Sequence, residues 1–208
     1  MSEFRSAINF VLWNECDDTA ACGKRIADVG GGFVNDPRDR GGATVYGISE
    51  VIRTREHISP GDLGIPDFSD ASLRMVKRED AEAVYRKIYW EAYGYEQLCQ
   101  DVATKIMDAA VNLNFRPPFV TAHWLAQGAA NALGCGLSPD GILGQQSIAA
   151  INGVDHQLFL QAFVVKLVGH YEAIIAEAHR QALLQNNPAL EQECWRSTWM
   201  ARAHRLHT

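Results

Sequence analysis

The stretch that decides the fold runs from Gly31 to Ser49 and reads GGFVNDPRDRGGATVYGIS. Its composition, with five glycines, one proline and three Asn or Asp residues, is typical of turns and short strands and not of a helix. Strands are expected only near Gly32 to Val34 and near Thr44 to Ile48. The loss of helical periodicity begins upstream, at Cys16. Because a long irregular region inside a compact chain is usually functional, we expect the chemistry of this protein to lie here.

Helical periodicity surrounds this region on both sides. Upstream, apolar side chains recur on one face of Ser2 to Glu15, and Ser2 can cap the helix. Loops rich in glycine and proline are expected at residues 59–69 and 134–144. The downstream helical patterns cover residues 49–57, 78–93, 102–113, the segment from Pro118 to Leu133, and residues 147–152, 154–185 and 188–206. The sequence therefore predicts a mainly α fold with a loop-rich or small β segment near the N-terminus.

Composition and charge exclude several classes of protein. The chain has 208 residues, of which 47% are hydrophobic and 21% charged, so it is neither disordered nor fibrous. Its formal net charge is −6 and it contains no long basic run, so we expect no nucleic-acid partner. The apolar stretch from Leu158 to Val168 contains Gln161 and Lys166 and is shorter than the roughly 20 residues of a membrane span. We therefore expect no stable membrane insertion, and the N-terminus shows no signal-peptide pattern.

The five cysteines show no metal-binding spacing. No CxxC pair and no Cys/His cluster occurs, so we expect no metal and no other cofactor. Reduced and mostly buried thiols are the simplest interpretation. A disulfide between Cys16 and Cys22 is the alternative that the sequence leaves open.

Two carboxylates near the glycine-rich stretch are candidates for acid/base chemistry. Glu15 ends an apolar-faced helix, where burial would raise the pKa of its carboxyl by disfavouring the charged form. Asp39 lies in the loop, where solvent would keep it ionised. Two carboxyl groups in contrasting environments are what glycosidic bond cleavage requires. From the residues alone, the default interpretation of Glu15 is an ordinary exposed side chain, and that of Asp39 is an Asx-turn residue.

The order of these residues carries a family resemblance. An apolar helix ending in Glu15 is followed by Gly31-Gly32-Phe33-Val34-Asn35-Asp36-Pro37, Asp39, Gly41-Gly42, Thr44 and Gly47-Ile48. Further motif residues are Tyr89-Trp90, Asp108, Asn112, Asp140-Gly141-Ile142-Leu143-Gly144, Trp199 and Arg202. This pattern resembles the glycoside hydrolase family 108 muramidases, which are phage endolysins and bacterial secretion-associated lysozymes. The resemblance implies a lysozyme-like helical fold with a catalytic segment, residues 1–95, and a helical predicted peptidoglycan-binding segment, residues 96–208, packed together as one compact unit.

One position departs from the family pattern. In the family the catalytic Glu directly precedes the two glycines, and here that position is Gly30. Either the catalytic acid has been lost, or residues 16–30 are a loop inserted between Glu15 and the glycines. We prefer the insertion, because Ile26 to Val29 is too short to replace the helix that carries the acid and because closure entropy grows slowly with loop length. We expect the inserted loop to border the substrate cleft near Glu15.

The resemblance implies a role for each matched residue. Glu15 is the expected general acid, Asp39 the second carboxylate and Thr44 the side chain that holds the attacking water. Tyr46 and Asn112 are expected to bind the glycan, although structural roles for Thr44, Tyr46 and Asn112 stay open. Support of the fold, and not contact with the glycan, is expected of Asp108, Trp90, Trp124, Trp195 and Trp199.

The implied function is hydrolysis of the β-1,4 bond between N-acetylmuramic acid and N-acetylglucosamine in peptidoglycan glycan strands. A monomeric phage endolysin, made in the host cytoplasm and released by a holin to act on the cell wall in the periplasm, fits these residues. A bacterial muramidase or effector delivered by secretion machinery fits them too. Two alternatives remain. One is a catalytically inactive relative that binds peptidoglycan, and the other is a lytic transglycosylase that leaves 1,6-anhydro products.

Overall fold

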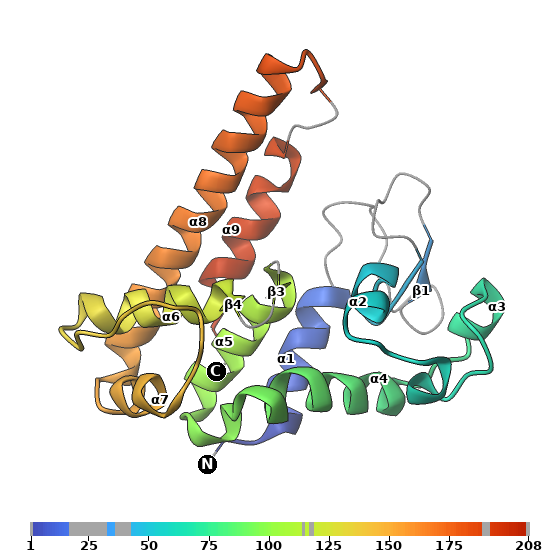
Figure 1. The fold of residues 1–208 in the computed structure, drawn as a ribbon, viewed down its shortest axis with the longest axis horizontal. Helices are drawn as coiled ribbons and strands as arrows, with labels where there is room; N and C mark the ends of the chain where they lie inside the picture. The colour runs from blue at the N-terminus through green and yellow to red at the C-terminus, as the bar shows by residue number, and fades with distance from the viewer. Residues whose placement is uncertain are drawn as a thin grey trace. The chain divides into compact units, whose positions relative to one another are not determined.

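The computed structural model describes residues 2–16, 33–35, 43–113, 115–116, 119–188 and 192–206. The chain divides into two compact units, residues 3–95 and residues 96–208 together with the first two residues. Helices dominate both units, so the prediction of a mainly α fold is confirmed (Figure 1). Asp39 and Cys22, and with them nearly all of the predicted insertion, lie outside the described residues.

The unit of residues 3–95 is built on a first helix, α1 (Phe4–Cys16), and a small β-hairpin. In the hairpin, β1 (Phe33–Val34) pairs antiparallel with β2 (Thr44–Val45), so that Phe33 lies opposite Val45. The Ser49 side chain caps the next helix by accepting a hydrogen bond from the Ile52 backbone N–H. The elements that follow the hairpin are α2 (Glu50–Arg55), η2 (Pro60–Leu63), α3 (Asp70–Leu73), α4 (Arg78–Tyr85), η3 (Arg86–Glu91) and η4 (Tyr95–Gln97).

Residues 78–93, predicted as one helix, are helical throughout, and η3 within them is a π-helix. A π-helical turn accommodates an extra residue without interrupting the chain of apolar side chains, so hydrophobic periodicity does not reveal it. It leaves Tyr85, Tyr89 and Trp90 all buried. The Trp90 ring meets Phe4 of α1 edge-on with ring centres 5.8 Å apart. The π-helix therefore anchors α1 within this unit.

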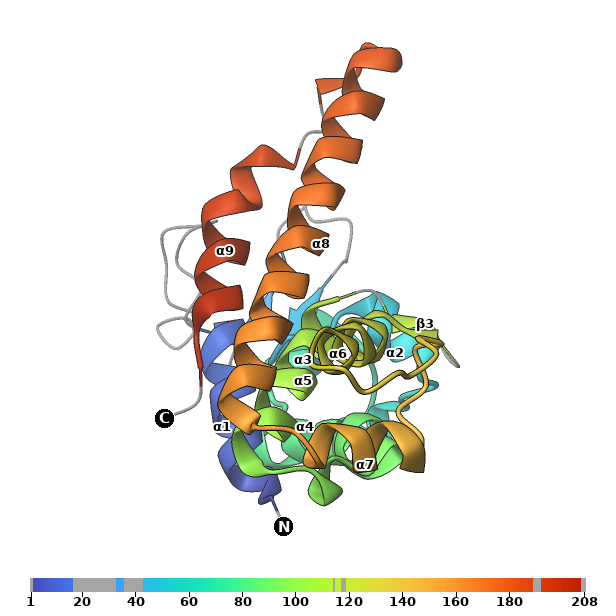
Figure 2. The same ribbon diagram turned by 90° about the vertical axis from the view of Figure 1, so that its left-hand side faces the viewer.

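The unit of residues 96–208 is a bundle around one long helix. That helix, α8 (His156–Leu184), packs against α5, α6, α7 and α9, and Figures 1 and 2 show it running beside α9. A second short antiparallel pair of strands, which was not predicted, joins Phe115 to Val120 and Arg116 to Phe119. The other elements are α5 (Gln100–Asn112), β3 (Phe115–Arg116), β4 (Phe119–Val120), α6 (Thr121–Ala132), α7 (Gln145–Asn152), η6 (Glu193–Trp195) and α9 (Arg196–His204).

Helix α8 is longer than the apolar stretch that the sequence suggested. It has 29 residues and is long and apolar enough to cross a membrane by length and composition, and 33% of its most apolar window is buried in the structure. The expectation that this apolar segment is too short for a membrane span is therefore wrong. The core helix of a soluble domain meets the same criterion, and α8 packs against four neighbouring helices.

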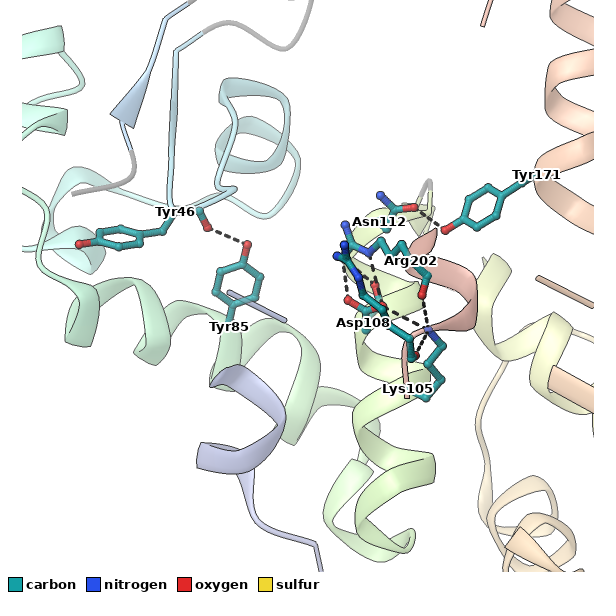
Figure 3. A network of polar contacts seen from close by, with 8 residues as sticks. Tyr46, Tyr85, Lys105, Asp108, Asn112, Tyr171 and Arg202 are labelled. Atoms are coloured by element: carbon teal, nitrogen blue, oxygen red, sulfur yellow. Dashed lines mark hydrogen bonds and ion pairs between the residues drawn. The ribbon is translucent and has the colours of Figure 1, made fainter. Parts of the chain in front are cut away.

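A buried charged cluster joins α5 to α9. Lys105 is fully buried, and its ammonium donates to the backbone carbonyls of Arg202 at 2.7 Å and Arg205 at 2.8 Å. The Arg202 guanidinium donates to the Asp108 carboxylate at 2.8 Å, as Figure 3 shows. Burial lowers the pKa of Lys105 to about 8, and the Asp108 carboxylate opposes that change. These paired charges hold the C-terminal helix against α5.

The tryptophans follow the expected packing only in part. Trp90 is buried, and Trp199 stacks on Tyr171 with ring centres 5.3 Å apart. The expectation of core packing is wrong for Trp124 and Trp195, which are 42% and 36% exposed. Trp124 lies on the outer face of α6, because the inner face of that helix is filled by small and aliphatic side chains at Ala122, Leu125, Ala126 and Ala129.

Candidate active site

The motif residues Tyr46 and Gly47 form the tip of a two-residue turn. Both have positive φ, 48° and 78°, as primed hairpin turns require. The turn is closed by the Ile48 backbone N–H, which donates to the Val45 carbonyl at 2.8 Å, and by the reciprocal bond at 3.3 Å. A positive φ is uncommon for a residue with a side chain, so Tyr46 is held in this conformation by the turn around it.

The carboxylate of Glu15 lies directly against this turn. A Cβ atom added to Gly47 would lie 3.1 Å from Glu15 Oε2 and 2.7 Å from the Tyr85 hydroxyl oxygen. Both distances are too short for ordinary packing, so only a glycine allows the end of α1 and the turn to approach this closely. The structure thus brings Glu15 together with the motif residues 46 and 47.

Two stacked tyrosines stand beside Glu15. The Tyr85 hydroxyl donates to the Tyr46 carbonyl at 2.9 Å, and Figure 3 shows the Tyr46 ring pointing away from this contact. The Tyr85 ring stacks on Tyr89 with centres 5.8 Å apart. Burial raises the pKa of the Tyr89 phenol, and the nearby carboxylates of Glu56 and Glu15 add to the rise. The buried, stacked rings of Tyr85 and Tyr89 therefore lie on one side of Glu15.

The other predicted site residues have different surroundings. Thr44 lies in β2 and is half-buried, next to the turn that Glu15 contacts. Asn112 ends α5 in the unit of residues 96–208, where its carboxamide oxygen accepts a hydrogen bond from the Tyr171 hydroxyl at 2.6 Å. That contact supports the packing of α5 against α8. Asp39 lies outside the described residues, so its distance from Glu15 is not part of this geometry.

A buried arginine that sequence analysis missed fixes the base of the hairpin. Arg53 is 5% exposed, and its Nη1 donates to the carbonyls of Ala43 at 2.9 Å and Ile48 at 3.0 Å. These two carbonyls bracket residues 44–47, which include Thr44 and the turn. Burial lowers the pKa of Arg53, while the Glu50 carboxylate opposes that effect. A lone arginine in a short helix gives no sequence signal for such a role.

Candidate ligand sites are few in the described part of the chain. No group of three or more His, Cys, Asp or Glu side chains gathers there as a metal site would require. Cys99 and Cys135 are free thiols.

A cavity of about 760 Å³ lies beside the hairpin in the unit of residues 3–95, and Arg53 lines it.

Residues 24–113 match the sequence model of the family Glycosyl hydrolase 108. Over these residues the chain is similar to that family. The match contains the turn, Thr44, Tyr46 and Asn112, and it begins downstream of Glu15. No curated protein sequence matches the chain.

The fold of the chain resembles that of a solved structure. SagA of Brucella abortus is similar with a TM-score of 0.58, over 97% of this chain and 96% of that chain. The two sequences are 19% identical, so the likeness is one of fold. The resemblance to family 108 is therefore confirmed for residues 24–113, and the glycoside hydrolase class follows from it.

Proposed function

We propose that the chain is a peptidoglycan hydrolase that cleaves the bond between N-acetylmuramic acid and N-acetylglucosamine, with Glu15 as its general acid. One observation carries the proposal: the Glu15 carboxylate lies against Gly47, inside the motif of a glycosyl hydrolase 108 domain. The Glu15 side chain comes from a helix upstream of the matched residues. If residues 16–30 are an inserted loop, Glu15 has to reach the glycine-rich motif across that loop, and its closeness to Gly47 fits this expectation.

The proposed reaction uses each of these groups once. Protonated Glu15 donates its proton to the glycosidic oxygen, and the bond from that oxygen to the anomeric carbon breaks. Water supplies the hydroxyl of the new reducing end, and the proton that this water releases passes to solvent, from which Glu15 is protonated again. Asp39 supports the positive charge that develops on the sugar, and Thr44 orients the water. The buried ring of Tyr85, stacked on Tyr89, lies on the same side of the turn as Glu15.

The products of digestion test this reaction. Purified peptidoglycan is incubated with the full chain, and the released fragments are analysed by mass spectrometry. We expect fragments with ordinary reducing ends on N-acetylmuramic acid. Fragments that end in 1,6-anhydro sugars would identify a lytic transglycosylase and contradict the proposal, as would reducing ends on N-acetylglucosamine.

An inactive peptidoglycan-binding relative is the second candidate. The observation that favours it is the start of the family match at residue 24, beyond the proposed acid. This candidate predicts that the chain sediments with intact peptidoglycan and releases no soluble fragment during prolonged incubation. The muramidase proposal predicts that sedimentation is followed by release.

We also propose that the enzyme acts on the cell wall in the periplasm, after release by a phage holin or delivery by a secretion machine. The support is the location of the proposed substrate, which lies outside the cytoplasmic membrane. Expression in a Gram-negative host with and without a holin tests the endolysin role. Lysis only when the holin is present supports that role, and lysis without it contradicts the need for a holin.

A further inference from the structure

The cavity beside the hairpin has the size of a small-ligand site. Its volume of about 760 Å³ lies within the range of roughly 300–1,000 Å³ that is typical of such sites. Asn35 and Ala43 line it from the ends of the two strands, and Phe68 and Asp70 line it from the start of α3. The residues of α2 that line it are Glu50, Arg53 and Thr54.

The charge of greatest interest in this cavity is the buried guanidinium of Arg53. Its Nη1 donates to the two hairpin carbonyls, and its Cζ lies 4.9 Å from the centre of the Phe68 ring. Among the described residues, neither Nη2 nor Nε of Arg53 has a hydrogen-bond acceptor. A buried cation with unused donors favours an anionic group, and a carboxylate matches the forked geometry of a guanidinium.

Negative charges line the same cavity. Glu50 and Asp70 are both exposed, and Asp70 Oδ2 accepts a hydrogen bond from Asn35 Nδ2 at 2.9 Å. A ligand that carried only a carboxylate would be repelled by these two side chains. A ligand with a carboxylate and an ammonium group would satisfy both signs of charge.

We propose that this cavity binds a zwitterionic amino-carboxylate group, with Arg53 facing the carboxylate and Glu50 and Asp70 facing the ammonium. The proposal rests on the proposed function, because within peptidoglycan this group is the free end of meso-diaminopimelate in the peptide stem. The N-acetylated sugars carry neither charge. A stem with lysine in the same position carries the ammonium but lacks the carboxylate. The cavity is therefore a specificity site for walls of the diaminopimelate type.

Calorimetric titration with three probes tests the ligand class on the full chain. The probes are L-Ala-γ-D-Glu-meso-diaminopimelate, the same tripeptide with L-lysine in third position, and chitotriose, which is neutral. We expect the diaminopimelate tripeptide to bind at least about tenfold more tightly than the lysine tripeptide, because one charge-assisted pair is lost. Equal affinity for the two tripeptides, or no binding of either, would overturn the proposal.

Two charge variants on α2 locate the site. Thr54→Glu places a carboxylate in the cavity lining without removing Arg53, and we expect it to weaken binding of the diaminopimelate tripeptide about tenfold. Val51→Glu adds the same charge to the same helix at a position that is 55% exposed and outside the cavity lining, and we expect it to bind as the wild type does. Equal effects of the two variants would overturn the assignment. Because binding is measured without turnover, this result is independent of whether the chain hydrolyses peptidoglycan.

Discussion

At the residue scale, the geometry of the candidate site depends on the absence of a side chain at position 47. The positive φ of Gly47 and its closeness to Glu15 and Tyr85 are two separate reasons for glycine. The motif Thr44 to Ile48 thus has a physical explanation, in which the tight turn presents its backbone to the end of α1. Tyr46 contributes its carbonyl to Tyr85, so its backbone is as important here as its ring.

Gly47→Ala should therefore destabilise the protein and reduce its activity. The added Cβ meets Tyr85 and Glu15 in a left-handed backbone conformation, and we expect a loss of about 2–3 kcal/mol in the free energy of unfolding. Thermal unfolding followed by circular dichroism measures the change. Gly169→Ala is the control, because a Cβ there meets nothing within 4 Å in the interior of α8, and it should stabilise by about 0.5–1 kcal/mol. Equal stability of Gly47→Ala and the wild type would contradict this account.

At the scale of elements, one glutamine fixes the glycine-rich segment between α6 and α7. Gln127 is 2% exposed, and its Oε1 accepts from the backbone N–H groups of Asp140 and Gly141, each at 2.9 Å. Its Nε2 donates to the Asp140 carboxylate, the Ile142 carbonyl and the Ser147 hydroxyl. All donors and acceptors of this amide are used, which explains how a loop without regular structure is held in one conformation.

Gln127→Ala should cost about 3 kcal/mol of unfolding free energy, because it removes these hydrogen bonds and leaves buried backbone groups without partners. Urea denaturation measures the loss. Gln146→Ala, at an exposed position in α7, is the matched control and should change stability by less than about 0.5 kcal/mol. A similar small effect of Gln127→Ala would show that water replaces the network at no cost.

At the scale of the whole molecule, the periodicity of apolar residues predicted the helices. The contacts between residues far apart in the sequence could not be predicted from it. The end of α1, predicted at Glu15 and found at Cys16, and the strand at Thr44 follow from periodicity and turn chemistry. The approach of both Glu15 and Tyr85 to Gly47 does not, since 70 positions of sequence separate Glu15 from Tyr85. The Arg53 contacts and the buried Lys105 likewise depend on backbone carbonyls, which every residue carries, so side-chain identity gave no signal. Asp39, predicted from its motif, stays a prediction.

A buried histidine should make the protein less stable in acid. His123 is fully buried, and desolvation lowers its pKa to about 4 from 6.5. Below pH 6.5 the imidazole becomes protonated in the unfolded chain but stays neutral in the folded chain until about pH 4. The contribution of neutral His123 to the free energy of unfolding is therefore fully present above pH 6.5 and decreases by up to about 3 kcal/mol as the pH falls toward 4. We expect the wild type to lose this much more than His123→Gln over that range, as measured by urea denaturation at each pH. Parallel pH profiles of the two proteins would contradict the prediction.

The central claim, that Glu15 is the catalytic acid, is tested most directly by the rate at which purified peptidoglycan releases reducing ends. We predict that Glu15→Gln lowers this rate at least about 100-fold with unchanged circular dichroism, because the amide cannot donate the proton. Glu91→Gln, at an exposed position of the same unit, should keep the wild-type rate. A wild-type rate for Glu15→Gln would contradict the claim.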